Sequence, residues 1–228
     1  MKYAVLILAS SMLCVGAAQA ALLDPATIQP GQFLPPPPVE GSPDAKAEMK
    51  EVNDIIVRSS AGDIAAAAKD DADENPDIFN GAIGFDVKTR PETFKLLTMV
   101  MNEEEGDTKA AKVFFHRKRP WVIDPAVKTC TLEKLNQVPN SYPSGHATLA
   151  FSLAPVLTHL FPEKSQVILA RASEYAEHRL VCGMHFRSDI VASQQYGTIL
   201  ALRLMETPAF MAQMQASQKE LHQTVAGK

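Results

Sequence analysis

Residues 143–161 read PSGHATLAFSLAPVLTHLF, a polar start followed by a long apolar run. A proline and a serine before such a run are typical of the beginning of a helix. The first backbone N–H groups of a helix have no partner within it, and the helix dipole favours negative charge there. Gly145 lets a ligand approach this backbone, Ser144 offers a hydroxyl donor, and His146 follows them. Taken alone, the segment favours an ordinary helix start that contains an incidental histidine.

Most of the chain after residue 43 carries helical patterns. Alanine-rich stretches and mixed apolar and charged stretches favour helix, whereas the alternation typical of strands is almost absent. Asp107 is the expected cap of a helix that begins at Thr108, and Pro120 lies beyond its end. The sequence therefore predicts an all-α fold, a single-domain helical bundle over residues 44–228. We expect helices over residues 45–57, 61–72, 91–101, 108–117, 145–161, 162–180, 188–205 and 207–225.

The first 20 residues have the pattern of a secretory signal peptide. Lys2 precedes an apolar run over residues 3–15, and an Ala-x-Ala pattern ends at Ala20. We expect cleavage after Ala20 and a periplasmic or secreted protein. The apolar run is shorter than the roughly 20 residues of a membrane span, and no later stretch approaches that length, so no membrane span is predicted.

Residues 21–43 form a proline-rich arm that includes four consecutive prolines at 35–38. Proline restricts its own φ and lacks an N–H donor, so an extended conformation is expected here rather than a helix. Phe33 and Leu34 precede the four prolines, which favours an arm that lies along the domain surface over a floppy leader.

The net charge argues against a protein that binds nucleic acid. The formal net charge is −4, and it becomes −5 without residues 1–20, which contain Lys2 and no acidic residue. Nucleic-acid-binding domains usually carry a basic surface instead. Acidic residues cluster at 70–74 and at 103–105, and we interpret both clusters as solvated helix ends. No metal site is therefore predicted.

Cys130 and Cys182 are the two cysteines that remain after removal of residues 1–20. An even number of cysteines in an exported protein favours a disulfide. Closing a loop of about 50 residues contributes on the order of 4 kcal/mol to stability. Two buried free thiols are the alternative. Because Cys182 lies between Arg179 and His185, a bridge would also brace that segment.

Lys112 and Arg119 form a pair of cations seven residues apart. In a helix this spacing is two turns, which places both on one face about 10 Å apart along the axis. Arg119 precedes Pro120, which disfavours helical backbone at Arg119 and lets its side chain turn into a pocket. The alternative is a basic surface strip, since residues 116–118 are also basic.

Arg179, His185 and Asp189 form a third group of candidate residues. A carboxylate four residues after a histidine can accept the Nδ1 proton, which leaves Nε2 unprotonated as a nucleophile requires. The alternative is a capping aspartate beside a structural histidine. Together, the three groups supply cations for a phosphate dianion, one imidazole to attack phosphorus and another to protonate the leaving oxygen. This combination predicts phosphoryl transfer through histidine.

The pattern Lys112-x6-Arg119-Pro120, the segment at 143–146 and Arg179-x5-His185-x3-Asp189, in this order, resemble a known signature. It is that of the type-2 phosphatidic acid phosphatase superfamily, which includes the vanadium haloperoxidases. The leader, the proline-rich arm, the size and the lack of membrane spans make the chain similar to the bacterial class A non-specific acid phosphatases.

This resemblance implies a helical fold and an acid phosphatase that hydrolyses organic phosphomonoesters without a cofactor. It also implies a phosphohistidine intermediate in which His185 attacks, Asp189 orients it, and His146 protonates the departing alcohol. Another alcohol in place of water would give phosphotransferase activity. Phosphate or vanadate is the implied ligand, and a homo-oligomer is a further implication. By position, the phosphate-binding residues are Lys112, Arg119, Ser144, Gly145 and Arg179.

The chain departs from the family pattern at His178, where the family usually has a serine. Two outcomes are open: His178 donates to the phosphate below about pH 6.5, where imidazole is charged, or it faces solvent. The same three groups also suit a vanadium-dependent haloperoxidase, a lipid or pyrophosphate phosphatase, or a phosphate-binding protein without turnover. The residues that hold the phosphate do not identify the leaving group.

Overall fold

The computed structural model describes residues 21–131 and 139–226. The expected signal peptide, residues 1–20, lies outside the described residues. All regular structure in the described ranges is helical, which confirms the predicted all-α fold. The longer helices are α2 (Pro43–Arg58), α3 (Ala61–Ala72), α5 (Pro91–Phe115), α7 (Gly145–Leu160), α8 (Ser165–Val181), α9 (Arg187–Met205) and α10 (Pro208–Ala226). The short ones are α1 (Pro30–Phe33), α4 (Asn80–Ile83) and α6 (Pro120–Ile123), with 3₁₀ turns η1 (Pro25–Thr27), η2 (Pro76–Phe79), η3 (Val87–Thr89) and η4 (Pro162–Lys164).

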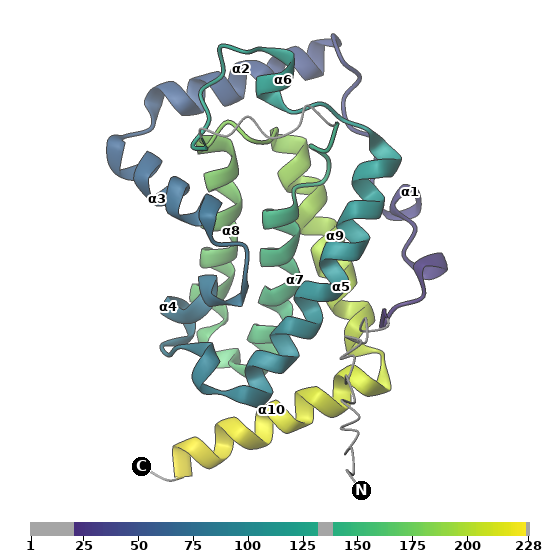
Figure 1. Cartoon of the computed structure of the whole chain (residues 1–228), viewed down its shortest axis with the longest axis vertical. Helices are drawn as coiled ribbons and strands as arrows, with labels where there is room; N and C mark the ends of the chain where they lie inside the picture. The colour runs from purple at the N-terminus through teal and green to yellow at the C-terminus, as the bar shows by residue number, and fades with distance from the viewer. Residues whose placement is uncertain (1–20, 132–138, 227–228) are drawn as a thin grey trace, which may run out of the picture.

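Helix α7 is the centre of the bundle (Figure 1). It is apolar on nearly all sides, and it packs against α5, α8 and α9, as expected for a helix without a polar face. Gly197 lets α9 approach closely, because a Cβ there would lie 2.6 Å from the carbonyl oxygen of Thr148. Helix α2 crosses one end of the bundle and α10 crosses the other.

Helix α5 differs from the prediction. We expected a break at Asp107, but one helix runs without interruption from Pro91 to Phe115. Residues on both sides of the expected break are buried on the same face, including Glu104 and Thr108. Burial of a continuous face outweighs the cost of about 1 kcal/mol for a glycine inside a helix, here Gly106.

The proline-rich arm is part of the folded domain. Leu23, Ile28 and Leu34 are buried in the main apolar core. The Tyr196 hydroxyl donates to the carbonyl of Ile28 at 3.0 Å, and the Tyr142 hydroxyl donates to the carbonyl of Pro35 at 2.7 Å. The arm is also less extended than predicted, since it forms η1 and α1. Both begin at a proline, which the first helical position tolerates because its N–H would be unpaired anyway.

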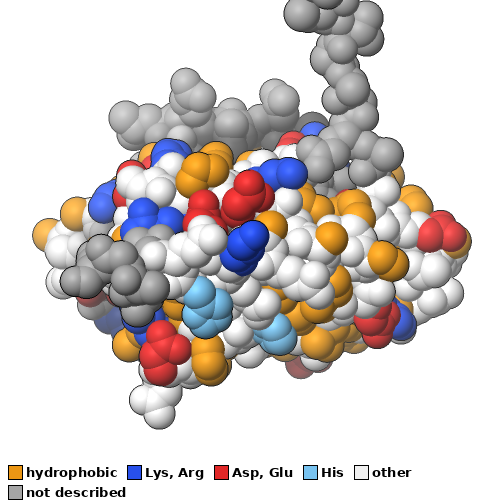
Figure 2. Space-filling view, turned by 90° about the horizontal axis from the view of Figure 1, so that it is seen from below, with side chains coloured by type: hydrophobic (Ala, Val, Ile, Leu, Met, Phe, Trp, Pro, Cys, Tyr) orange, Lys and Arg blue, Asp and Glu red, His pale blue; other side chains and the backbone are white. Residues whose placement is uncertain are grey.

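The surface shows no single dominant charge on the face drawn in Figure 2, where acidic and basic side chains are interspersed with apolar ones. Among the described residues, no helix combines the length and the apolar character that a membrane crossing requires. We predicted that both acidic clusters are solvated helix ends, and the structure corrects this prediction. Glu103 and Glu104 are buried on α5, and the cluster at 70–74 reaches the site described next.

Candidate active site

The start of α7 follows from the Pro-Ser-Gly sequence. Ser144 caps the helix with its hydroxyl, which accepts from the amide of Ala147 at 3.4 Å. Ser193 on α9 accepts from the amide of Ser144 at 2.8 Å and fixes the capping residue in place. Ser144 is fully buried and does not line the adjacent cavity, so its hydroxyl serves the helix start rather than the open site. Gly145, in contrast, lies at the cavity wall.

A cavity of about 460 Å³ brings the three sequence groups together. Six residues assigned from the sequence line it: Lys112, Arg119, Gly145, His146, Arg179 and His185. The remaining two, Ser144 and Asp189, lie behind this wall. Residues that the prediction did not include complete the lining: Asp71, Ala72, Glu74, Thr131 and Met184.

His185 presents its Nε2 atom to the cationic side of the cavity. Nδ1 donates to the carbonyl oxygen of Ser141 at 2.8 Å, and Nε2 accepts from the guanidinium of Arg119 at 3.1 Å. These partners require the tautomer with a proton on Nδ1 and a lone pair on Nε2. Burial and the nearby cations hold the pKa of His185 well below its usual value, so the ring is neutral.

Asp189 supports His185 less directly than the sequence suggested. Its Oδ2 lies 3.3 Å from Nδ1 of His185, which is longer than the bond from Nδ1 to Ser141. The same oxygen accepts from the Ser141 hydroxyl at 2.6 Å and from the amide of Phe186 at 2.9 Å. Asp189 therefore fixes the Ser141 side chain and the start of α9 as well as the imidazole.

Arg117 is a residue of the site that the sequence reasoning missed. We placed it in a possible surface strip, but it is buried and donates to Asp189 at 2.6 Å and to Glu48 on α2 at 2.6 Å. Its guanidinium lies over the ring of Phe186, 4.2 Å from the centroid. The chain reverses at His116, whose φ is +53°, and this turn directs Arg117 inward. No spacing in the sequence indicated that reversal.

Three cations line the cavity close to one another. Arg119 has the extended backbone expected before a proline, and its side chain is held by Asn140 at 2.7 Å. Burial and the neighbouring cations lower the pKa of Lys112 and lower that of Arg119 to about 10. Arg179 is fully buried, pairs with Asp71 at 2.5 Å, and has an Nε atom without a hydrogen-bond partner among the described residues. A buried guanidinium of this kind is suited to donate a hydrogen bond to an anion.

His146 is the second imidazole of the cavity. Its Nδ1 lies 3.0 Å from Oε1 of Glu74, and its Nε2 lies 3.1 Å from the carbonyl oxygen of Asp71. The ring stacks on Tyr175 of α8, with 5.7 Å between the ring centroids. Both ring nitrogens of His146 therefore face oxygen acceptors.

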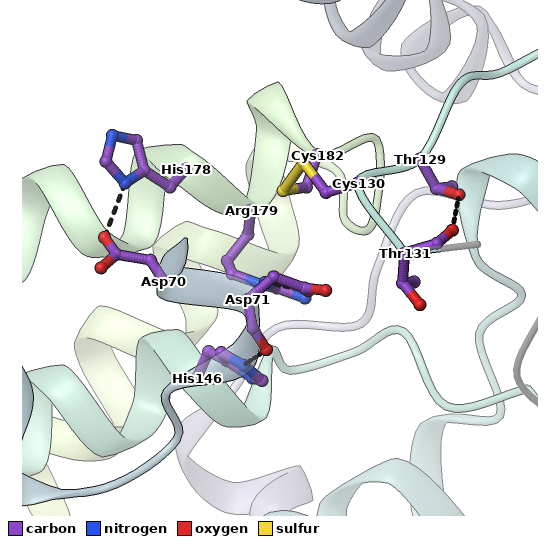
Figure 3. Close-up of a disulfide and its surroundings, with 9 residues drawn as sticks. All are labelled: Asp70, Asp71, Thr129, Cys130, Thr131, His146, His178, Arg179 and Cys182. Atoms are coloured by element: carbon purple, nitrogen blue, oxygen red, sulfur yellow. Dashed lines mark hydrogen bonds and ion pairs between the residues drawn. A yellow bond between two sulfur atoms is a disulfide. The ribbon is translucent and has the colours of Figure 1, made fainter. Parts of the chain in front are cut away.

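His178, which replaces the usual serine of the family, has neither of the two positions that we considered. His178 neither faces the cavity nor points freely into solvent; its Nδ1 lies 2.6 Å from Oδ2 of Asp70 on α3. Arg171 binds both oxygens of the same carboxylate. Figure 3 shows His178 directed to Asp70 while Arg179 is directed toward Asp71. His178 therefore anchors α3 to α8.

Cys130 and Cys182 form the predicted disulfide beside the cavity (Figure 3). The amide of Cys130 also donates to the carbonyl of Cys182 at 3.3 Å. Gly183 follows with a φ of +62°, and a Cβ there would lie 2.4 Å from the carbonyl oxygen of Lys128. The absence of a side chain at 183 and the bridge together hold residues 128–131 against the turn that leads to His185.

Within the described parts of the chain, no group of three or more His, Cys, Asp or Glu side chains is arranged to hold a metal ion. Three of the four acidic residues at 70–74 have cationic or histidine partners instead. Asp70 binds Arg171 and His178, Asp71 binds Arg179, and Glu74 binds His146.

Comparison with known proteins places these residues in a family. Residues 93–212 match the PAP2 superfamily model. A non-specific acid phosphatase of Providencia stuartii is 33% identical over 197 residues, which cover 82% of this chain and 79% of the relative. One of Salmonella typhi is 33% identical over 202 residues, covering 83% of this chain and 79% of the relative.

An acid phosphatase of Zymomonas mobilis is 28% identical over 196 residues, which cover 83% of this chain and 74% of that protein. Among solved structures, LpxE of Aquifex aeolicus has a similar fold, with a TM-score of 0.55, 20% identity, and coverage of 69% of this chain and 93% of the other. The family match includes the three cations and both histidines of the cavity, and the chain belongs to the PAP2 superfamily.

Proposed function

We propose that this protein is an acid phosphatase that hydrolyses phosphomonoesters through a phosphohistidine at His185. The observation that supports the proposal most is the cavity in which a neutral, buried imidazole, a second imidazole and three cations converge. A tetrahedral dianion is the ligand that such a cavity fits. The relatives named acid phosphatases support the same activity.

In the first step, the lone pair on Nε2 of His185 attacks phosphorus and the bond from phosphorus to the ester oxygen breaks. The departing oxygen takes a proton from His146 and leaves as an alcohol. The attacking ring gains positive charge, which the Ser141 carbonyl and the Asp189 carboxylate stabilise from the Nδ1 side. Lys112, Arg119 and Arg179 balance the charge on the phosphoryl oxygens, which is the main requirement of this transition state.

In the second step, water attacks the phosphorus atom and gives a proton to His146. The bond from nitrogen to phosphorus breaks, which releases inorganic phosphate and restores neutral His185. An alcohol in place of water would form a new phosphate ester by the same sequence of events. Vanadate, also a tetrahedral oxyanion, is expected to bind the cavity and compete with substrate.

We also propose that the protein is exported, with cleavage after Ala20, and that it acts in the periplasm or outside the cell. The pattern of residues 1–20 supports export. The disulfide between Cys130 and Cys182 supports an oxidising compartment. A homo-oligomer is part of the same proposal, and sedimentation of the purified protein tests it.

Trapping of the covalent intermediate tests the proposed reaction. The protein is mixed with p-nitrophenyl phosphate, quenched in alkali, digested and analysed by mass spectrometry. We expect phosphate on His185 and loss of both turnover and label in His185→Ala. His159→Ala is the control, because His159 lies in the last turn of α7, at the end away from Gly145. Undiminished turnover in His185→Ala, or loss of turnover with a chelator, would refute the mechanism.

A further inference from the structure

Glu74 lies where the proposed reaction needs the oxygen of a substrate. Its Oε1 is 3.0 Å from Nδ1 of His146. A Cβ built on Gly145 would lie 2.9 Å from that same oxygen and 3.3 Å from Nζ of Lys112. The carboxylate oxygen therefore lies against the start of α7, beside Lys112. Its neighbours are the groups that the proposed mechanism assigns to the phosphate and to the departing oxygen.

The ring of His146 is oriented by contacts other than Glu74. Nε2 faces the backbone carbonyl of Asp71, and the ring stacks on Tyr175. The Tyr175 hydroxyl donates to the carbonyl of Asp73 at 2.6 Å, which ties this stack to the same segment. Nδ1 is therefore the nitrogen available to a departing oxygen, and Glu74 now occupies the acceptor position opposite it.

Of the three carboxylates of this segment that have ion-pair partners, Glu74 is the most exposed and therefore the easiest to displace. Its side chain is 49% exposed, whereas that of Asp71 is 16% exposed and is bound to Arg179. A phosphate ester can thus displace Glu74 without breaking the pair between Asp71 and Arg179. Because residue 74 is part of the cavity wall, we expect its displaced carboxylate to stay near the leaving group.

We propose that Glu74 is a specificity-determining residue that fills the leaving-group position until a substrate displaces it. It competes with the substrate phosphate and selects among esters by the charge of their leaving group. A cationic group near the ester oxygen is favoured by the displaced carboxylate, and an anionic group is disfavoured. The interaction between two charges a few ångströms apart near a protein surface changes the affinity for the ester by about tenfold or more.

The first experiment measures the binding of inorganic phosphate and requires no turnover. Isothermal titration compares the wild type with Glu74→Gln, which keeps the size of the side chain and removes its charge. We expect about tenfold tighter phosphate binding in Glu74→Gln, because the internal competitor is gone. Glu163→Gln is the matched control, since Glu163 is exposed and lies in the turn η4. Equal or weaker binding in Glu74→Gln overturns the proposal.

The second experiment rests on the proposed phosphatase function and uses three esters with the same two-carbon skeleton. They are phosphoethanolamine (cationic), 2-hydroxyethyl phosphate (neutral) and phosphoglycolate (anionic). We expect the ratio of kcat/KM for the cationic over the anionic ester to fall about tenfold or more in Glu74→Gln. The ratio is expected to stay constant in Glu163→Gln, and a constant ratio in Glu74→Gln overturns the proposal.

The two experiments separate failure of this inference from failure of the proposed function. If the wild type hydrolyses none of the three esters and no p-nitrophenyl phosphate, the phosphatase function fails. Phosphate binding then still decides whether Glu74 occupies the anion position. Glu74→Ala provides a second variant, with circular dichroism to establish folding, and it is expected to change phosphate affinity in the same direction as Glu74→Gln.

Discussion

At the scale of single residues, the environment of His185 sets how the activity depends on pH. Burial and the cations Arg119, Arg179 and Lys112 lower the pKa of His185 below its usual value of 6.5. A lowered pKa means that Nε2 keeps its lone pair at more acidic pH. The acidic limit of activity, where the nucleophile becomes protonated, is therefore expected below pH 6.5.

The wild-type profile of kcat/KM against pH, with p-nitrophenyl phosphate, tests this expectation. Lys112→Met removes one of the cations that lower the pKa of His185, so its acidic limit is expected at higher pH, together with weaker substrate binding. Lys109→Met is the control, because Lys109 is exposed one turn earlier and pairs with Glu105. A wild-type limit at or above pH 6.5 would contradict the electrostatic argument.

Arg117 gives a second prediction at this scale, for stability. Arg117→Met leaves the fully buried carboxylate of Asp189 without its guanidinium partner. Breaking a buried pair by removing one partner costs about 3–5 kcal/mol. We expect a loss of that size in the free energy of unfolding measured with urea.

The neighbouring residue supplies the control for this experiment. Lys118→Met also removes a cation, but Lys118 is exposed and pairs with exposed Glu40. An exposed pair contributes about 0–1 kcal/mol. Equal losses in the two variants would show that the pair between Arg117 and Asp189 does not stabilise the fold.

Several roles at this scale were not deducible from the sequence. The histidines and the cations were indicated by the spacing of residues within three short segments. It did not indicate that Ser144 would cap a helix away from the cavity or that the Ser141 carbonyl would hold His185. It also did not reveal Glu74, whose importance comes from contacts with segments distant in the chain.

At the scale of elements, the disulfide joins the turn before His185 to residues 128–131. The cysteines are 52 residues apart. In the chain-entropy model, opening a loop of this length costs about 4 kcal/mol. We expect the double variant Cys130→Ser/Cys182→Ser to lose stability on that order and to lose activity, because Thr131 lines the cavity.

Unfolding with and without dithiothreitol, together with kcat/KM, measures these effects. The reductant is expected to destabilise the wild type and to leave the double serine variant unchanged. Equal unfolding free energies for the wild type with and without reductant would contradict a stabilising disulfide. Retained activity in the double variant would show that the geometry of the site does not depend on the disulfide.

Helix α5 shows why element boundaries were harder to predict than helical character. The residues around Asp107 have the local signals of a cap, and those signals predicted two helices. The structure has one helix, because the residues on either side bury a common face against α7 and the arm. The residues that this face packs against lie in α7 and the arm, so the sequence around Asp107 does not reveal it.

At the scale of the whole molecule, the arm and the bundle form one folding unit. Leu34 is 4% exposed in the main core, whereas Val39, also in the arm, is 76% exposed. Leu34→Ala is expected to lower the free energy of unfolding by about 2–5 kcal/mol, because it leaves a cavity. Val39→Ala is the matched control, with an expected change within about 0.5 kcal/mol.

Urea unfolding of both variants measures the difference. A loss in Leu34→Ala no larger than that in Val39→Ala would mean that the arm contributes little to the fold. A single cooperative transition in the wild type is also expected, since the arm residues share one core with α5, α7 and α9.

The sequence by itself determined the helical class, the disulfide partners and six of the residues that line the cavity. The helical class follows from local composition, the disulfide partners follow from the number of cysteines, and short spacings within three separate segments indicated the cations and histidines. The tertiary structure alone decided which charges meet. Asp189 pairs with Arg117, Asp70 with His178, and Glu74 with His146, because bundle packing brings together segments about 70 to more than 100 residues apart.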